Sequence, residues 1–274
     1  MKTIGIRGIS DLDFCDRENK YGVSIDSVVV YQAVQALSMS NVQQVLNHGK
    51  QVQLVIEFHD SFANLNAIAQ GLYDNYLHAF INDLRKDGRH LWVRPLHELN
   101  SDWYSWGIYK PGNTIGLFIS AWKHIVQVFR SSKANVSFQL CYNYIDPCDK
   151  PARFELMYPG DNYVDAVGVN VYNRAGLDQW HTTYPSFQAL FTPAYARLTK
   201  LTRKPLFIGE MSATSYGGDK CQWITDAFNA WSQFPQVVTM NWFLESKQEG
   251  PVWGDWNLTT AEQEQAWIRG VRGR

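Results

Sequence analysis

The sequence predicts an α/β protein, a (β/α)8 TIM barrel in which residues 1–274 form a single domain. The 274 residues suit this fold, since α/β barrels routinely take roughly 200 to 250 residues as one unit. Eight short runs rich in β-branched residues recur along the chain, and stretches with helical periodicity lie between most of them. Because the runs are almost continuously apolar, they indicate a parallel sheet that is covered on both faces.

The predicted strands follow one another in order, and turn residues bound each of them. They cover residues 3–9, 27–31, 52–58, 91–96, 136–141, 166–171, 206–208 and 237–243. Apolar stripes at helical spacing run through residues 72–84 and 115–129, and Asn113-Thr114 form a plausible cap for the second stripe. An open, nucleotide-binding sheet is disfavoured, because residues 5–8 read GIRG and no GxGxxG or GxxxxGK[ST] motif is present.

Composition and charge exclude several kinds of partner. With a net charge of -1, the chain offers no basic surface for nucleic acid or for an anionic membrane. Its longest apolar stretches, such as residues 52–58, fall far short of the roughly 20 residues that cross a bilayer. We therefore expect a soluble monomer with an uncharged partner.

Cysteines and aromatic residues each leave two interpretations. Four cysteines are too sparse for a disulfide scaffold. A bridge between Cys141 and Cys148 across a loop is one alternative, and free thiols are the other. The eleven Trp and fourteen Tyr residues suit a cleft for a hydroxylated ligand, but a large aromatic core would use them equally well.

In a (β/α)8 barrel the chemistry lies where strands end and the following loops begin. Six of the predicted strands end in polar and aromatic residues, which should therefore meet on one rim. These ends are residues 57–60, 94–98, 141–143, 170–173, 209–210 and 241–243.

Two of these ends supply glutamates that directly follow apolar strands. Glu98 follows the fourth strand and Glu210 follows the seventh, so they face each other across the barrel mouth. A pair of carboxyl groups is the minimum equipment for glycoside hydrolysis, with a gap of about 5 to 5.5 Å for retention or roughly 6.5 to 9.5 Å for inversion. The competing interpretation is that both are solvated loop acids.

The neighbours of Glu98 favour the catalytic interpretation. By two-residue alternation Arg94 shares a face with Glu98, where a guanidinium can keep a carboxylate ionised. His97 points either into the site or into the core. The loop that follows places three aromatic rings within residues 103–106, next to Asn and Asp side chains, which is typical of carbohydrate subsites.

Several segments, taken in order and spacing, resemble glycoside hydrolase family 26, the β-mannanase family. They are residues 94–100 (RPLHELN) with the aromatic loop 103–107, residues 158–165 (YPGDNYVD) with the strand to Tyr172, residues 205–210 ending in Glu210, and Trp242. The resemblance implies a retaining endo-hydrolase with Glu98 as acid/base and Glu210 as nucleophile.

The resemblance also implies that Arg94, His97, Trp103, Tyr172 and Trp242 shape the subsite of the attacked sugar. Three further residues at the strand ends and in the aromatic loop complete the expected substrate-binding set: His59, Trp106 and Asn143. From the residue chemistry, we expect Tyr172 to hydrogen-bond Glu210. We also expect Glu98 to have the higher pKa in the free enzyme, because it first gives up a proton.

Several alternatives concern the substrate. We expect a β-linked polysaccharide, first β-1,4-mannan, with mixed-linkage β-1,3-1,4-glucan and β-1,3-xylan as alternatives. Ser105 interrupts the aromatic run, and residues 211–213 (MSA) replace the family's usual Phe-Gly-Ser. A polysaccharide substrate suggests an extracellular location, although residues 1–14 contain no apolar block of the length of a secretory signal. A carbohydrate-binding barrel without turnover is the alternative from another class.

Other chemistry finds little support. Glu57, His59, Asp60 and His97 lack the HxH or HExxH spacing of metal ligands, so we expect neither a metal nor another cofactor. Ser212 lacks the GxSxG elbow of a serine hydrolase. Trp180, Trp253 and Trp256 belong to loops that follow strands six and eight, where they either form a distal sugar platform or pin those loops to the barrel.

Overall fold

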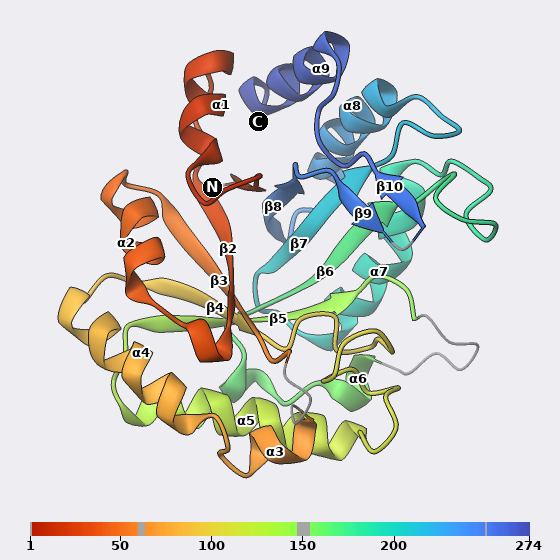
Figure 1. Ribbon diagram of the computed structural model, residues 1–274. Coiled ribbons are helices and arrows are strands. Elements are labelled where there is room, and N and C mark those ends of the chain that lie inside the picture. Colours follow the sequence, from red (N-terminus) through yellow and green to blue (C-terminus); the bar gives the residue numbers. More distant parts are fainter. Residues whose placement is uncertain (1, 60–63, 147–153, 250) are drawn as a thin grey trace.

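The computed structural model describes residues 2–59, 64–146, 154–249 and 251–274, and it contains a closed barrel of eight parallel strands, β1 to β8, in chain order (Figure 1). The last strand pairs with the first through residues 3–7 and 239–243, which closes the barrel. The predicted fold class is confirmed.

Each strand is followed by helical structure that packs around the barrel. The strands are β1 (Thr3–Arg7), β2 (Ser27–Ala33), β3 (Gln51–Glu57), β4 (Leu91–Pro95), β5 (Val136–Asn143), β6 (Ala166–Asn173), β7 (Leu206–Ala213) and β8 (Val237–Phe243). The α-helices are α1 (Asp13–Tyr21), α2 (Met39–Asn47), α3 (Leu65–Ala69), α4 (Asp74–Asp87), α5 (Ile115–Ser131), α6 (Phe154–Met157), α7 (Phe187–Leu201), α8 (Lys220–Ala230) and α9 (Ala261–Arg272). Short 3₁₀ turns are η1 (Val34–Ala36), η2 (Asp161–Tyr163) and η3 (Trp231–Gln233), and a small hairpin joins β9 (Lys247–Glu249) to β10 (Val252–Gly254).

The strand ends differ from the predicted ones in ways that matter for the site. β4 ends at Pro95, because Leu96 already has a positive φ of 53°. β7 continues to Ala213, five residues beyond the predicted end. Hydrophobic patterning missed this part of β7, since its inward side chains include the polar Glu210 and Ser212.

The predicted helices are present with one correction. The side chain of Thr114 caps α5 by accepting a hydrogen bond from the backbone N–H of Leu117 (3.1 Å), as predicted. Leu72 and Tyr76 were expected on the buried stripe before β4, but both are exposed. Leu72 precedes the first residue of α4, so the helical spacing does not extend to it.

The interior of the barrel is polar, which the apolar strand patterns did not predict. Arg94 donates hydrogen bonds to Gln53 Oε1 (2.6 Å) and Gln139 Oε1 (2.8 Å), and Gln53 donates to Asn241 Oδ1 (2.7 Å). A side chain at Gly5 would clash with this layer, because its Cβ would lie 1.9 Å from Asn241 Oδ1. The network joins β3, β4, β5 and β8 directly beneath the barrel mouth.

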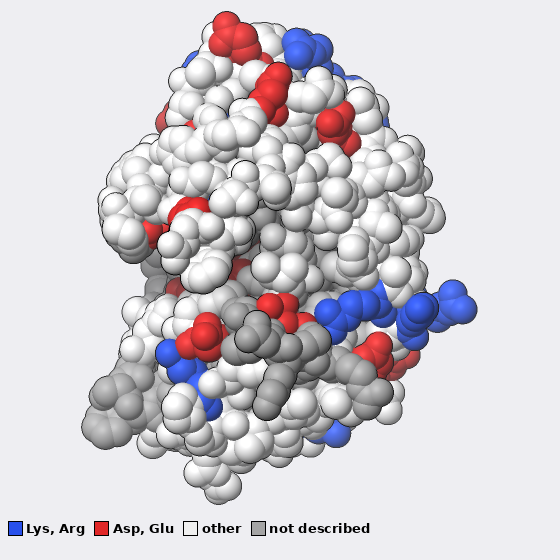
Figure 2. All heavy atoms as spheres, turned by 90° about the vertical axis from the view of Figure 1, so that its right-hand side faces the viewer, with Lys and Arg blue, Asp and Glu red and all other residues white. Residues whose placement is uncertain are grey.

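The loops that follow the strands gather on the right-hand side of Figure 1, together with the β9–β10 hairpin. Figure 2 looks onto this side, where a hollow crosses the surface and acidic side chains gather along it. We refer to this side as the rim. Among the described residues, no helix is long and apolar enough to span a membrane.

Candidate active site

Glu98 lies just beyond the end of β4, on a backbone that turns sharply. Leu96 and Glu98 both have positive φ angles, 53° and 51°, which side-chain-bearing residues rarely adopt. The N–H of Glu98 donates to the carbonyl of Cys141 on β5 (2.8 Å), and this bond anchors the turn. Backbone strain of this kind persists where surrounding contacts enforce it, and it concentrates at functional sites.

Two N–H donors hold the buried carboxylate of Glu98. The indole Nε1–H of Trp103 donates to Oε2 (3.0 Å), and the amide of Asn170 donates to Oε1 (2.8 Å). Asn170 is itself oriented by Cys141, whose thiol donates to its Oδ1 (3.2 Å). Each oxygen of Glu98 is therefore tied to a different element, the aromatic loop after β4 and the strand β6.

A β-bulge directs Glu210 toward the barrel mouth. The register between β6 and β7 shifts between Val169 and Asn170, so that Asn170 pairs with Glu210 and Gly209 is left over. Gly209 has no room for a side chain, because a Cβ there would lie 2.4 Å from Asn170 Oδ1 and 2.6 Å from Cys141 Sγ. The bulge thus packs Asn170, which donates to Glu98, against the strand that carries Glu210.

Two phenols donate hydrogen bonds to Glu210. Tyr172 donates to Oε2 (2.6 Å), as predicted, and Tyr31 on β2 donates to Oε1. Asn170 and Tyr172 lie two residues apart on β6 and face the same side of the strand. The strand β6 therefore contacts both carboxylates, Glu98 through Asn170 and Glu210 through Tyr172.

Burial dominates the acidity of both carboxyl groups. It raises the pKa of Glu210 from 4.5 to about 7, against the positive charges of Lys247 and Arg7. Burial also raises the pKa of Glu98, but the hydrogen bonds from Asn170 and Trp103 oppose it. We expected Glu98 to have the higher pKa, but the larger rise is at Glu210, where the charges of Lys247 and Arg7 offset only part of the desolvation.

The β9–β10 hairpin brings a cation to the site. Lys247 Nζ lies 4.8 Å above the ring of Phe243, which is 5.9 Å from the ring of Tyr172. The positive charge of Lys247 lowers the pKa of both Glu98 and Glu210. The ring of Trp256 also packs edge-on against Tyr172, with centroids 5.0 Å apart.

Arg94 has a different role from the one expected. Its guanidinium is fully buried and donates to Gln53, Gln139 and the carbonyl oxygen of Gly209 (3.0 Å). Pro95 ends β4 and positive φ angles follow, so the two-residue alternation that placed Arg94 beside Glu98 does not apply. Arg94 braces the bulge before Glu210, and its hydrogen bonds do not reach the carboxylate of Glu98.

His97 lies in an aromatic cluster beside the site. Its Nε2 is 3.0 Å from the hydroxyl of Tyr104 and 4.0 Å from Glu57 Oε1. Burial and the charge of Arg94 lower its pKa well below 6.5, so the imidazole is neutral.

His59 is half-exposed on the rim, with Nε2 3.2 Å from Glu57 Oε2. Asp60, the other residue considered there, lies outside the described residues.

Two of the expected aromatic walls are buried. Trp106 is 0% exposed; it stacks under Tyr104 with centroids 4.4 Å apart and donates to the carbonyl of His97 (2.7 Å). Trp242 is 1% exposed and stacks on Phe228 of α8 at 5.1 Å, outside the barrel wall. Asn241 faces the interior, so alternation turns Trp242 outward and Phe243 inward.

Trp103 is the expected ring that does lie open, with 45% of its surface exposed. The polar groups of Asn143 bond within its own surroundings. Its side chain accepts a hydrogen bond from the N–H of Ile145, and its carbonyl accepts one from Asn100. It therefore shapes the loop after β5. Trp256 is buried and donates to Glu249 Oε1 (3.2 Å), so it pins the hairpin.

Sequence reasoning placed Asn170 and Phe243 among the strand ends on the rim without a specific role, and it gave no role to Tyr31 or Lys247. Tyr31 ends the predicted second strand, which was not among the six strand ends considered. Lys247 carried no signal, because the hairpin that presents it has no strand-like pattern. Among residues outside the masked segments, no three His, Cys, Asp or Glu side chains are grouped to hold a metal ion.

The structure describes three of the four cysteines. Cys141 is a free, buried thiol, so the alternative of a bridge to Cys148 is wrong for Cys141. Cys148 itself lies outside the described residues.

A (β/α)8 barrel with two buried carboxylates after β4 and at β7 has the site architecture of a glycoside hydrolase. Comparison with known families agrees, since residues 36–236 match glycosyl hydrolase family 26. The chain belongs to this family. Both glutamates lie within the matched segment, whereas Phe243 and the β9–β10 hairpin follow it.

The relatives of the chain are enzymes of greater length. Endoglucanase H of Acetivibrio thermocellus is 30% identical over 269 residues, which cover 91% of this chain and 29% of that protein. A mannan endo-1,4-beta-mannosidase of Bacillus subtilis is 29% identical over 114 residues, 40% of this chain and 28% of that protein. The chain therefore spans less than a third of the length of these relatives.

A solved structure confirms the arrangement of the barrel. The family 26 domain of an endo-beta-mannanase/endo-beta-glucanase from Prevotella bryantii superimposes with a TM-score of 0.72 at 14% identity. The superposition covers 100% of this chain and 89% of that one. At this identity the likeness concerns the fold.

Proposed function

We propose that the protein is a retaining endo-β-glycanase that hydrolyses a neutral β-linked polysaccharide, with Glu210 as nucleophile and Glu98 as acid/base. One observation carries the proposal: two buried carboxylates stand across the barrel mouth, and β6 contacts both of them through Asn170 and Tyr172. Two acids with different surroundings on one rim are what double displacement at an acetal carbon requires.

In the first step Glu210 attacks the anomeric carbon while Glu98 protonates the departing oxygen, and a glycosyl-enzyme forms. Tyr31 and Tyr172 orient the attacking carboxylate, since each phenol holds one of its oxygens. In the second step Glu98 removes a proton from water, which attacks the anomeric carbon, and the bond between the sugar and Glu210 breaks to free the carboxylate. The N–H donors of Trp103 and Asn170 favour the ionised form of Glu98, which is the form this step needs.

The surroundings of the pair suit a substrate that carries hydroxyl groups. Trp103 offers an open ring on which the C–H face of a sugar can stack, and Lys247 offers N–H donors for hydroxyl groups. We propose β-1,4-mannan as the first substrate, since relatives of the chain include mannan endo-1,4-beta-mannosidases. Mixed-linkage β-1,3-1,4-glucan is the second candidate, because the relative that matches 91% of the chain is named an endoglucanase. β-1,3-Xylan is tested alongside them.

Release of reducing ends from galactomannan, barley β-glucan and β-1,3-xylan tests the proposal. We expect the wild type to cleave at least one polysaccharide and Glu210→Ala to be inactive, while Glu155→Ala, which removes an exposed carboxylate on α6, stays fully active. Polysaccharide binding without cleavage by any protein would instead indicate a binding barrel.

A second measurement tests the role of Glu98. Glu98→Ala should cleave polysaccharide very slowly, yet still release the leaving group of an aryl glycoside with a burst, because such a group needs no protonation. Equal losses on both substrates would contradict an acid/base role for Glu98.

A further inference from the structure

We infer that Trp180, Tyr216 and Trp253 form a distal binding surface for additional sugar units of the polysaccharide, beyond the catalytic pair. We refer to these three residues as the distal aromatic surface. The inference rests on the proposed function, and it assigns a binding role to residues that take no part in the chemistry. It further predicts that long chains are preferred to short ones.

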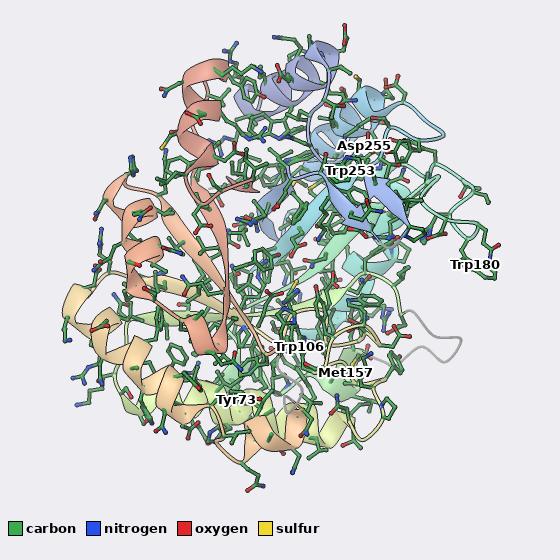
Figure 3. All side chains as sticks on the ribbon, in the orientation of Figure 1. Tyr73, Trp106, Met157, Trp180, Trp253 and Asp255 are labelled. Carbon is green, nitrogen blue, oxygen red and sulfur yellow. The ribbon has the colours of Figure 1, made fainter. Side chains whose placement is uncertain are left out.

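The first observation is where exposed rings occur. Among the described residues, the exposed tryptophans are Trp103, Trp180 and Trp253, and all three lie on segments that follow the carboxyl ends of strands. Trp180 is 80% exposed and Trp253 is 53% exposed. Trp106, by contrast, is buried near the lower edge of the mouth, while Trp180 projects from the loop at the far right (Figure 3). Rings that stay exposed at the mouth end of the barrel are available to stack on the pyranose rings of a substrate.

The second observation is that these rings belong to one connected structure. The hydroxyl of Tyr216 donates to the carbonyl of Trp253 (2.8 Å), which ties the loop after β7 to β10. Gly176 lies against Tyr216, since a Cβ at Gly176 would approach the Cβ of Tyr216 to 2.5 Å. Gly176 in turn donates to the carbonyl of His181, next to Trp180 (2.8 Å). The rings are therefore presented by loops that brace one another.

The third observation is continuity with the catalytic pair. Arg174 forms an ion pair with Glu249 (2.9 Å), which joins the loop of Trp180 to the β9–β10 hairpin. Glu249 accepts a hydrogen bond from Trp256, and Trp256 packs on Tyr172, the phenol that donates to Glu210. A chain bound at the pair can thus extend along the hairpin side of the rim.

The chemistry of the surface selects a sugar polymer as its occupant. Flat indole and phenol faces accept the C–H faces of pyranose rings, and Arg174 and Glu249 offer donors and acceptors for hydroxyl groups between them. Arg174 and Glu249 neutralise each other, and the acidic side chains along the hollow would repel an anionic polymer. A second copy of the protein is the competing occupant, and the experiment separates the two.

The test compares long and short substrates in Trp180→Ala and Trp253→Ala. We expect each substitution to lower kcat/KM on the best polysaccharide roughly tenfold, as expected for a truncated aromatic contact, and to leave an aryl disaccharide within about twofold of the wild type. Tyr76→Ala on α4 is the control, because it removes an exposed ring away from the rim. Equal changes on both substrates, or none on the polysaccharide, would overturn the inference.

Affinity electrophoresis in gels containing the same polysaccharides separates this inference from the proposed function. In the background of Glu210→Gln, the two tryptophan substitutions should weaken retardation by the polysaccharide even if the wild type proves inactive. Retardation that is unchanged would refute the surface. Sedimentation at increasing protein concentration identifies the competing case: a dimer that dissociates in Trp180→Ala or Trp253→Ala would show that the rings bind another copy.

Discussion

Replacement of Glu210 by Gln should stabilise the protein at alkaline pH, at the cost of activity. Burial raises the pKa of Glu210 from 4.5 to about 7. The folded state therefore binds a proton more tightly than the unfolded state, and the stability due to this carboxyl is lost as the pH rises from 4.5 through 7. Above that range the buried negative charge opposes folding, whereas Gln carries no charge at any pH.

The size of the effect follows from the two pKa values. A rise from 4.5 to about 7 corresponds to about 3 kcal/mol of unfolding free energy at about pH 8, and about 1 kcal/mol of this is already lost at about pH 5. The free-energy difference between Glu210→Gln and wild type should thus grow by about 2 kcal/mol from pH 5 to pH 8. Comparing the free-energy difference at the two pH values removes any contribution from hydrogen bonds that is the same at both.

Urea unfolding followed by tryptophan fluorescence at both pH values provides the assay. Glu262→Gln is the control, since hydrogen bonds from its own backbone N–H and from Thr260 lower the pKa of this exposed carboxyl on α9. Its stability difference should stay nearly the same between pH 5 and pH 8, because a carboxyl with a pKa below 4.5 is already largely ionised in both the folded and the unfolded state. A difference for Glu210→Gln that is the same at pH 5 and pH 8 would refute the argument that burial sets the charge of Glu210.

Three other substitutions test the supports of the two carboxylates. Tyr172→Phe removes a donor to Glu210, the proposed nucleophile, and should move the acidic limb of the kcat/KM profile to higher pH; Tyr31→Phe should act in the same direction, and an unmoved limb would contradict this role. Cys141→Val should lower kcat roughly tenfold by freeing the amide of Asn170, while Cys141→Ser should restore it; equal rates in both variants would argue against orientation by the thiol. Gly209→Ala should lose several degrees in Tm and most activity, because its Cβ would lie 2.4 Å from Asn170 Oδ1, and a wild-type melting curve would contradict the clash.

The fold could be predicted because it depends on periodicity, which the sequence displays directly. Apolar strands and amphipathic stripes alternate along the whole chain, and the closed barrel follows from their number. Glu98 and Glu210 could be located for the same reason, since each directly follows an apolar run. The hydrogen bond of Tyr172 to Glu210 was predictable because the ends of β6 and β7 are neighbours in the barrel.

The predictions failed where the backbone departs from regular geometry. Positive φ angles at Leu96 and Glu98 broke the alternation that placed Arg94 beside the carboxylate. Trp242 was assigned to the cleft by motif position, although its neighbour Asn241 already occupies the inward face of β8. Lys247 reaches the site through a hairpin whose short strands show no pattern. Bulges and turns of this kind depend on contacts between distant segments, which local patterns do not encode.

The bulge at Gly209 also determines where this chain tolerates changes in length. One residue deleted from β7 before Glu210 would reverse the orientation of every later side chain of the strand and turn Glu210 toward the helices. Residues 174–186 belong to no strand or helix, so insertions in this loop would alter only the rim. Homologues should therefore keep the spacing of the barrel strands fixed while this loop varies, which would allow new substrates to be acquired without rebuilding the catalytic pair.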